Sequence, residues 1–248
     1  MLGLGNSLVG GTVLSVEAPI YSLSLDGADD YVTFTAQTYN VNGSGNNGTI
    51  AFWAKRTDNN DEATILGNSA GAAFRRLYFD SDGDRLDIES DSNSQIAHAP
   101  VTADTNWHHY AITWTGNSGG STATTVIYED GSAITTTNSN FGVAAGKHFT
   151  VNQIGAGGTS GSNTHEFKGL LYQLAIWSSA LDADAVADMY NSGTPIPLQQ
   201  DKGNYDGSEE LVNLWRFDEG TGSATTDAIG GLTGTFQGDA TFSSTTPS

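Results

Sequence analysis

The chain has 248 residues, with 28 acidic and 9 basic side chains, 31 glycines, 5 prolines and no cysteine. The lack of cysteine excludes disulfides and thiolate metal sites, and the formal net charge of −19 opposes binding to nucleic acid or to anionic lipid. No apolar run is long enough to insert in a membrane, and no Lys or Arg precedes Lys55, so secretion by the general route is not expected.

Residues 1–20 contain apolar side chains scattered among Gly and Ser without a regular period. We interpret them as an N-terminal arm, and residues 21–248 as one domain. Two roles for the arm stay open. In the first role, it packs along its own domain. In the second, it anchors the chain to neighbouring subunits of a larger assembly. The second is considered because fixing the backbone costs about 1–2 kcal/mol of conformational entropy per residue, and contacts of the arm's own small side chains offset little of that cost.

The first candidate site lies in the stretch LSLDGADDYV, where Asp26, Asp29 and Asp30 fall within five positions. Crowded carboxylates suit Ca²⁺, a hard ion that takes oxygen ligands at about 2.3–2.6 Å. The alternative is that Asp26 and Gly27 form a turn and the other two carboxylates are solvated. The three aspartates are therefore a candidate calcium site with a purely structural rival.

The segment TIAFWAK at 49–55 is apolar on both faces, which predicts a central strand. Ile50, Phe52 and Ala54 should share one face, opposite Ala51 and Trp53. The preceding loop at 41–48 and the glycine-rich stretch at 154–163 are expected to be outward-facing loops that are free to bind ligand. The second of these lacks the lysine and the strand-turn-helix setting of a phosphate-binding loop.

The acidic stretch at 79–94 is best explained by a hairpin about Asp82-Gly83. A calcium loop and a catalytic carboxylate pair both fail there on spacing. The predicted register places two apolar pairs on the inner face and two oppositely charged pairs on the outer face, which stabilise a ladder by roughly 0.2–1 kcal/mol each. These pairs are Phe79 with Leu86, Leu77 with Ile88, Asp80 with Arg85, and Arg76 with Glu89.

Two adjacent histidines, His108 and His109, could suggest a metal site, but neighbours on a strand point to opposite faces and cannot both reach one ion. We therefore expect them to serve packing. No Ser-His-Asp arrangement supports nucleophilic chemistry. A second hairpin is predicted about Asp130-Gly131, with Tyr128 opposite Ala133 and Ile127 opposite Ile134.

The stretch from Phe167 to Gly193 joins a strand pattern to a helix pattern. Simple alternation places Leu170, Tyr172, Leu174 and Ile176 on one face and Leu171, Ala175 and Trp177 on the other. The helix is expected to begin after Asp182, whose carboxylate can cap the first free amides, and to stop at Gly193.

Six segments resemble the LamG-like family of laminin G, concanavalin A-like and pentraxin-related jelly-roll domains. The strongest is the Phe-x-Gly start at Phe167 and Gly169, which leads a core strand into Trp177 and a short helix. The others are 23–32, 49–55, 107–116, 126–131 and the tryptophan-aspartate-glutamate-glycine segment at 211–222. The resemblance implies an all-β, two-sheet antiparallel jelly-roll sandwich with one short helix, often with a calcium ion at its rim.

The family pattern is broken at Gln173, where many relatives carry aspartate, and this weakens the case for calcium because glutamine brings no charge. In the last segment, Trp215 and Phe217 should share a face. Asp218, Glu219 and Asp227 form a second acidic candidate site.

Both chain ends also resemble LamG-containing proteins of tailed phages, which are made in the reducing cytoplasm of the host. We therefore expect a non-catalytic decoration or adhesion module on the virion surface, with a cell-surface glycan as ligand and the arm bound to other virion subunits. An extracellular location is the alternative. Two rival functions stay open: a structural decoration protein without ligand, and a glycan-cleaving enzyme, which needs two carboxylates about 5–9.5 Å apart.

Overall fold

The computed structural model describes residues 21–41, 45–57, 62–69, 76–81, 84–90, 94–116, 124–138, 148–159 and 162–248. The arm at 1–20 and the turn at Asp82-Gly83 lie outside the described residues. In the part of the chain that is described, no helix has both the length and the apolar character needed to cross a membrane.

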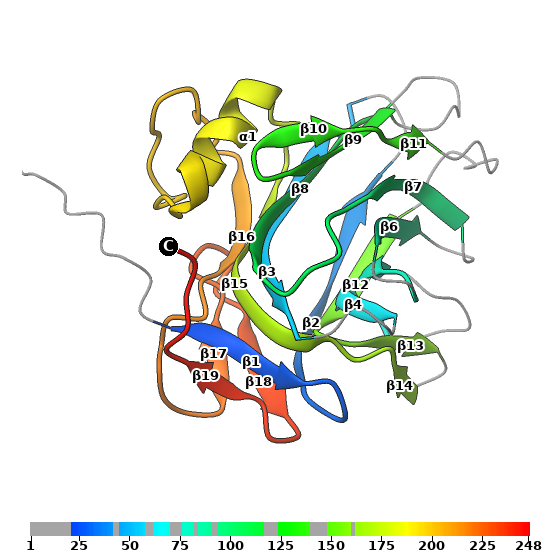
Figure 1. Cartoon of the computed structure of the whole chain (residues 1–248), viewed down its shortest axis with the longest axis vertical. Coiled ribbons are helices and arrows are strands. Elements are labelled where there is room, and N and C mark those ends of the chain that lie inside the picture. The colour runs from blue at the N-terminus through cyan, green and yellow to red at the C-terminus, as the bar shows by residue number, and fades with distance from the viewer. Residues whose placement is uncertain are drawn as a thin grey trace, which may run out of the picture.

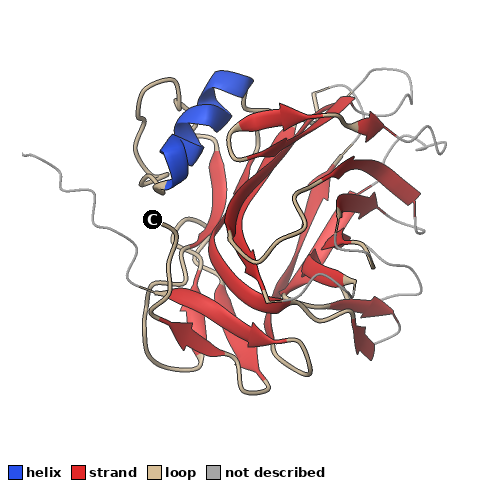
Figure 2. Ribbon diagram, in the orientation of Figure 1, coloured by secondary structure: helices blue, strands red, loops and turns tan. Residues whose placement is uncertain are grey.

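Two large antiparallel sheets form the jelly-roll sandwich that the sequence predicts, with one short helix beside it (Figures 1 and 2). The first sheet contains β1 (Ser22–Asp26), β3 (Gly48–Arg56), β8 (Trp107–Thr115), β9 (Thr124–Glu129), β10 (Ser132–Ile134), β15 (Lys168–Trp177), β16 (Leu211–Trp215) and β19 (Thr241–Ser243). Its order is β10-β9-β8-β3-β15-β1-β19, and β16 pairs with the later half of β15.

The second sheet has the order β11-β7-β6-β5-β4-β12-β2-β18-β17. Its strands are β2 (Tyr31–Asn40), β4 (Ala63–Gly67), β5 (Arg76–Phe79), β6 (Arg85–Ser90), β7 (Ser94–Pro100), β11 (Thr137–Asn138), β12 (His148–Ile154), β17 (Ala224–Thr226) and β18 (Thr233–Gln237). A separate hairpin, β13 (Gly157–Thr159) and β14 (Ser162–Thr164), replaces the loop that was expected at 154–163.

The strand β3 is central, as its two apolar faces predict, because it pairs with β8 on one side and with β15 on the other. Ile50, Phe52 and Ala54 enter the core between the sheets. Ala51 belongs to a second apolar cluster on the other face of the first sheet, under the helix α1 (Ala183–Tyr190). Trp53 also lies on that face, where its ring stacks near Tyr190 of the helix.

The face assignment predicted for β15 is correct after residue 173 but wrong for Leu171, because of a bulge at Gln173, which has a φ of 49°. The bulge adds one residue, so Leu171 lies on the same side as Leu174 and Ile176, in the core between the sheets. Ala175 and Trp177 face the helix side. A single extra residue therefore exchanges the two faces of the strand.

The helix begins as predicted, since Asp182 accepts a hydrogen bond from the amide of Ala185 at 2.9 Å. It ends two residues earlier than expected. Asn191, with a φ of 45°, is the left-handed cap, and a short 3-10 turn, η1 (Asn191–Gly193), follows it. Asparagine is among the few non-glycine residues that adopt this conformation readily, which explains why it ends the helix in place of Gly193.

Both predicted hairpin registers are confirmed. In β5 and β6, Leu77 lies opposite Ile88, Phe79 opposite Leu86 and Arg76 opposite Glu89. In β9 and β10, Tyr128 lies opposite Ala133 and Ile127 opposite Ile134. Asp130 and Gly131 both have positive φ, 48° and 74°, as a two-residue turn of this kind requires.

The charged face of the first hairpin is largely buried, contrary to the expectation of an outer surface. Arg76 is 5% exposed and Asp87 is 0% exposed. Arg76 bonds Glu89 at 3.0 Å and Glu62 at 2.9 Å, while Arg85 and Gln95 both donate to Asp87. Buried charges of this kind persist because each has a partner of opposite charge or a hydrogen-bond donor.

Candidate functional site

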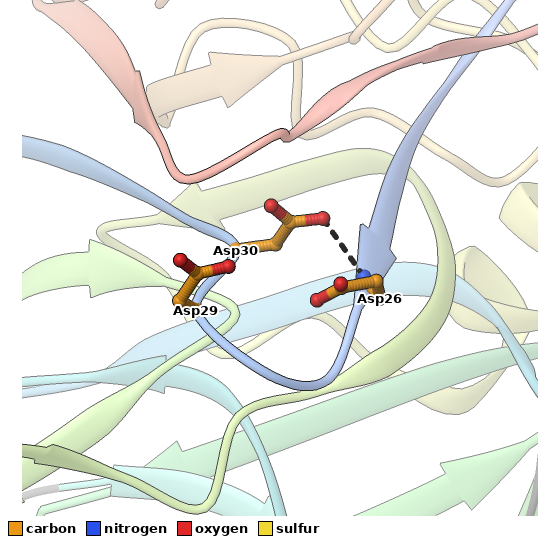
Figure 3. Close-up of side chains that lie close together, drawn as sticks. All are labelled: Asp26, Asp29 and Asp30. Carbon is orange, nitrogen blue, oxygen red and sulfur yellow. Dashed lines mark hydrogen bonds between the residues drawn. The ribbon is translucent and has the colours of Figure 1, made fainter.

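The three aspartates come together in the turn that joins β1 to β2, at the rim of the sandwich. Asp26, Asp29 and Asp30 each offer an oxygen, and these atoms lie within 4.8 Å of one another. Figure 3 shows the bond that closes the turn, from the amide of Asp26 to the Asp30 carboxylate, 2.9 Å long. Gly27, with a φ of 79°, allows the chain to reverse, so the predicted turn is confirmed, but Asp30 is buried and not solvated as the alternative required.

Asp30 is the buried member of the cluster, and it joins two parts of the chain. Its second oxygen accepts a hydrogen bond from the amide of Asp239 at 2.6 Å, in the turn between β18 and β19. Gly238 permits this approach, because a Cβ there would lie 2.6 Å from the same oxygen. Asp30 therefore connects the first and last turns of the domain.

Burial raises the pKa of Asp30 above its ordinary value, and the negative charges of Asp26 and Asp29 raise it further, against the two amide bonds that lower it. A cation at the rim would relieve both the burial and the repulsion. Asp26 and Asp29 are exposed, and each Asp30 oxygen keeps a second lone pair beside its amide bond. The carboxylate oxygens of Asp26, Asp29 and Asp30 are thus suitable ligands for a calcium ion bound weakly at the surface.

Asp26 also lines a groove of about 680 Å³ that the sequence did not reveal. Its walls come from the turn after β1, the end of β3, the start of β4, the turn after β5 and the segment before β15. Six titratable side chains line it, namely Asp26, Arg56, Glu62, His165, Glu166 and Lys168. The groove is large enough for a ligand of several rings, since ligand pockets commonly span about 300–1,000 Å³.

Several of these side chains are held in place by contacts beneath the groove. Arg56 is buried, with its guanidinium 4.3 Å from the centre of the Phe79 ring. Glu62 accepts from Arg76 at 2.9 Å and lies 3.0 Å from His165 Nδ1. His165 has a φ of 59°, a conformation uncommon outside glycine, and such positions recur at functional sites.

The other acidic candidates are not gathered into a site. Asp227 is buried and accepts hydrogen bonds from Asn213, Leu214 and Ile229. Glu219 accepts from Thr225 and Thr226, and Asp218 pairs with Arg216. Among the described residues, the Asp26 cluster is the one group of three or more candidate metal-ligating side chains.

Gln173 lies away from the rim, because its amide donates to the carbonyl of Ile196 at 2.6 Å in the segment after the helix. Trp215 and Phe217 both enter the core between the sheets, as predicted. The departure from the family pattern at Gln173 therefore concerns a bulge in β15 and leaves the rim carboxylates unaffected.

The two histidines of β8 face opposite sides, as expected. His109 is buried against Trp53 and Tyr190, with ring centroids 5.0 Å and 6.4 Å away, and burial lowers its pKa to about 4. His108 Nδ1 lies 2.8 Å from Asp130, and its Nε2 lies 3.1 Å from Asp104. The hydrogen bond to Asp130 is the main cause that raises the pKa of His108 to about 9, and the one to Asp104 adds to it.

This raised pKa predicts a loss of stability in alkali. The folded pKa of about 9 exceeds the ordinary 6.5, so the contribution of His108 is complete below about pH 6.5 and is lost as pH rises through 9. Its upper limit is about 3 kcal/mol. Asp130→Asn keeps the acceptor for the amide of His109 and suits the positive φ, but it removes the charge.

Denaturant unfolding of both proteins between pH 6 and 9.5 tests this expectation. The free energy of unfolding should fall with pH in the parent and should fall less in Asp130→Asn. The matched control is Asp206→Asn, because Asp206 is exposed. Parallel pH curves for the parent and Asp130→Asn would contradict the assignment.

The two antiparallel sheets, with a groove at the rim, give this chain the architecture of a lectin-like sandwich domain. Residues 26–187 match a laminin G family described as the Concanavalin A-like lectin/glucanases superfamily. The match covers more than half of the chain, so the protein belongs to this superfamily.

The individual proteins that this chain resembles share less than a third of its residues over the aligned parts. The non-toxic nonhemagglutinin type C of Clostridium botulinum C phage is 29% identical over 93 residues, which are 37% of this chain and 8% of that protein. The chain thus spans a small part of the curated relative that it matches. A candidate carbohydrate-binding protein of Bacteroides ovatus is 16% identical, with a TM-score of 0.61 over 93% of this chain and 61% of that one. A pentraxin of Limulus polyphemus is 20% identical, covering 69% and 82% of the two chains with a TM-score of 0.47.

Proposed function

We propose that the protein is a non-catalytic glycan-binding module whose ligand lies in the groove beside Asp26. The observation that carries the proposal is the open groove itself, lined by both carboxylates and cationic side chains. Carboxylates such as Glu166 accept hydrogen bonds from sugar hydroxyls, and ammonium groups such as that of Lys168 donate to sugar oxygens. Such a lining suits a hydroxyl-rich ligand better than an apolar one.

Fold-level analogy supports the proposal. The superfamily is described by its lectins and glucanases, and the Bacteroides ovatus protein of the same fold is a candidate carbohydrate-binding protein. Because one sandwich fold hosts many functions, the lining of the groove counts for more than the fold.

We also propose that calcium binds at Asp26, Asp29 and Asp30. Since Asp26 belongs to both sites, an ion there would place a positive charge at one end of the groove, where it could take sugar hydroxyls as further ligands. Calcium that binds only the folded chain would also stabilise it, by about 1.4 kcal/mol when its concentration is about tenfold above Kd.

The glycan proposal is tested with the full chain on an array of neutral and acidic glycans, in calcium and in chelator. We expect saturable binding that weakens in chelator, and Lys168→Gln and Glu166→Gln to lower the affinity at least tenfold. The matched control is Lys202→Gln, because Lys202 is exposed and lies outside the lining of the groove.

Each rival function has its own outcome in this experiment. No binding to any glycan would favour a structural decoration protein. New reducing ends that Glu166→Gln abolishes would make the protein a glycan-cleaving enzyme, with Glu166 as one of its carboxylates. Binding that persists unchanged in chelator would remove calcium from the proposal and leave the groove.

We propose that in the cell the protein decorates a phage particle or serves in its adhesion. Residues 1–20 would bind other virion subunits, and the module would be exposed on the virion surface. The similarity to a protein of Clostridium botulinum C phage supports a phage origin. Cross-linking of intact particles that finds residues 1–20 joined to no other subunit would remove the anchoring role.

A further inference from the structure

A second pocket, of about 270 Å³, lies among the ends of β2, β8 and β15 and the starts of β3 and β16. It is lined by aromatic, amide, hydroxyl and aliphatic side chains, and none of the described residues that line it is charged. This is unusual in a chain with a net charge of −19, and it contrasts with the charged lining of the groove. The two sites therefore suit ligands of different chemistry.

The second pocket is at the opposite end of the sandwich from the groove. The strand β3 starts beside the pocket at Gly48 and reaches the groove at Arg56. The strand β15 runs the other way, from Lys168 at the groove to Trp177 at the pocket. At about 3.4 Å per residue, the two sites lie about 27 Å apart along β3.

Two tryptophans line the pocket from opposite faces of the first sheet, and the indole N–H of each already has an acceptor. The Trp114 ring lies over Gly48, where a Cβ would be 2.1 Å from the ring, so glycine is required there. Its indole N–H donates to the carbonyl of Asn40 at 3.1 Å. The indole N–H of Trp177 donates to the hydroxyl of Tyr205 at 3.1 Å. Both side chains are almost fully buried, so the strand ends that carry them are held rigidly.

Tyr39 lines the second pocket, and a hydrogen bond from its hydroxyl to Asn213 holds its side chain in place. Its hydroxyl donates to Asn213 Oδ1 at 2.7 Å, and the Asn213 amide donates in turn to the buried carboxylate of Asp227. Burial, followed by the nearby Asp227 charge, raises the pKa of Tyr39, so the phenol stays protonated. A half-buried aromatic ring held in this way is preorganised for contact with a ligand.

The mouth of the pocket combines an apolar and a polar group. Val212 is 38% exposed, one of two large apolar side chains this exposed among the described residues. Asn47 also lines the pocket, and its carbonyl oxygen accepts a hydrogen bond from the amide of Gly116 at 3.2 Å, which holds the side chain in place. The pocket thus offers apolar surface and amide donors, the two features that a pyranose ring requires, with its C–H face and its hydroxyls.

We propose that this pocket is a second saccharide site, which takes a single neutral sugar residue. Its volume is below the usual range for ligands of several rings, and its lack of charge gives a carboxylated or aminated sugar no counter-ion. With the groove at the other end, the module would have two sites about 27 Å apart on one rigid sandwich.

The test uses the full chain and the methyl glycosides of glucose, galactose and mannose, followed by titration calorimetry and tryptophan fluorescence. At least one glycoside is expected to bind saturably in the millimolar range. Asn47→Asp keeps the acceptor for Gly116 and removes the NH₂ donor, and Val212→Arg obstructs the mouth from an exposed position. Each variant should weaken binding at least tenfold while leaving the melting temperature near that of the parent.

Lys202→Gln is the matched control and should leave methyl glycoside binding unchanged, because Lys202 is exposed and lines neither site. The two pocket variants separate the two sites, because Asn47 and Val212 do not line the groove. No saturable binding by any of the three glycosides would overturn the proposal. Binding that both pocket variants retain would also overturn it.

Discussion

Replacing Gly169 by alanine is expected to destabilise the protein by about 3 kcal/mol, among the largest effects of any single substitution. Gly169 lies in β15 between β1 and β3, with a φ of 149°. A Cβ there would be 2.1 Å from the carbonyl oxygen of Lys55 and 3.1 Å from the Cα of Arg56. Both are backbone atoms of a central strand and cannot move away without breaking the ladder.

Thermal unfolding measures this effect, and a loss of about 3 kcal/mol lowers the melting temperature by about 6–12 °C at this chain length. Gly222→Ala is the matched control, because Gly222 also has positive φ, 98°, but nothing lies within 4 Å of its Cβ position. The control should cost about 1 kcal/mol, from backbone strain alone. If both variants melt together, the close approach of the strands is not what requires glycine.

The second large effect is expected at Asp227, where substitution by alanine should cost about 3–4 kcal/mol. Its carboxylate is 1% exposed and accepts from the amides of Leu214 and Ile229 and from the side chain of Asn213. Removing it leaves three donors without this acceptor, and the bonds from Asn213 and Leu214 are buried. Asn213 also holds Tyr39, so the change should disturb the wall of the second pocket as well.

Glu219→Ala provides the comparison for Asp227. Glu219 accepts from Thr225 and Thr226 in the same part of the chain, but it is exposed, so water can replace it and the cost should stay below about 1 kcal/mol. Denaturant unfolding gives both free energies. Equal losses for the two variants would mean that burial of the Asp227 carboxylate is not what makes it important.

The sequence predicts those features that depend on neighbours along the chain. The hairpins at residues 76–90 and 124–134 follow from turn residues and from alternation over a few positions, so their registers are as predicted. The cluster of Asp26, Asp29 and Asp30 is visible for the same reason, because a tight turn keeps residues close in sequence close in space. The helix start at Asp182 is likewise a local capping pattern.

Long-range packing determines the features that the sequence did not reveal. The groove brings together Arg56, Glu62 and Lys168, and the second pocket brings Tyr39 beside Trp177 and Val212, so residues more than a hundred positions apart meet only when the sheets form. The Gln173 bulge exchanges the faces of β15, and the sequence around it carries no glycine to signal it. Alternation and turn chemistry are local, so they determine the strands, whereas the sites at the ends of the sandwich depend on which strand ends the sheets place side by side.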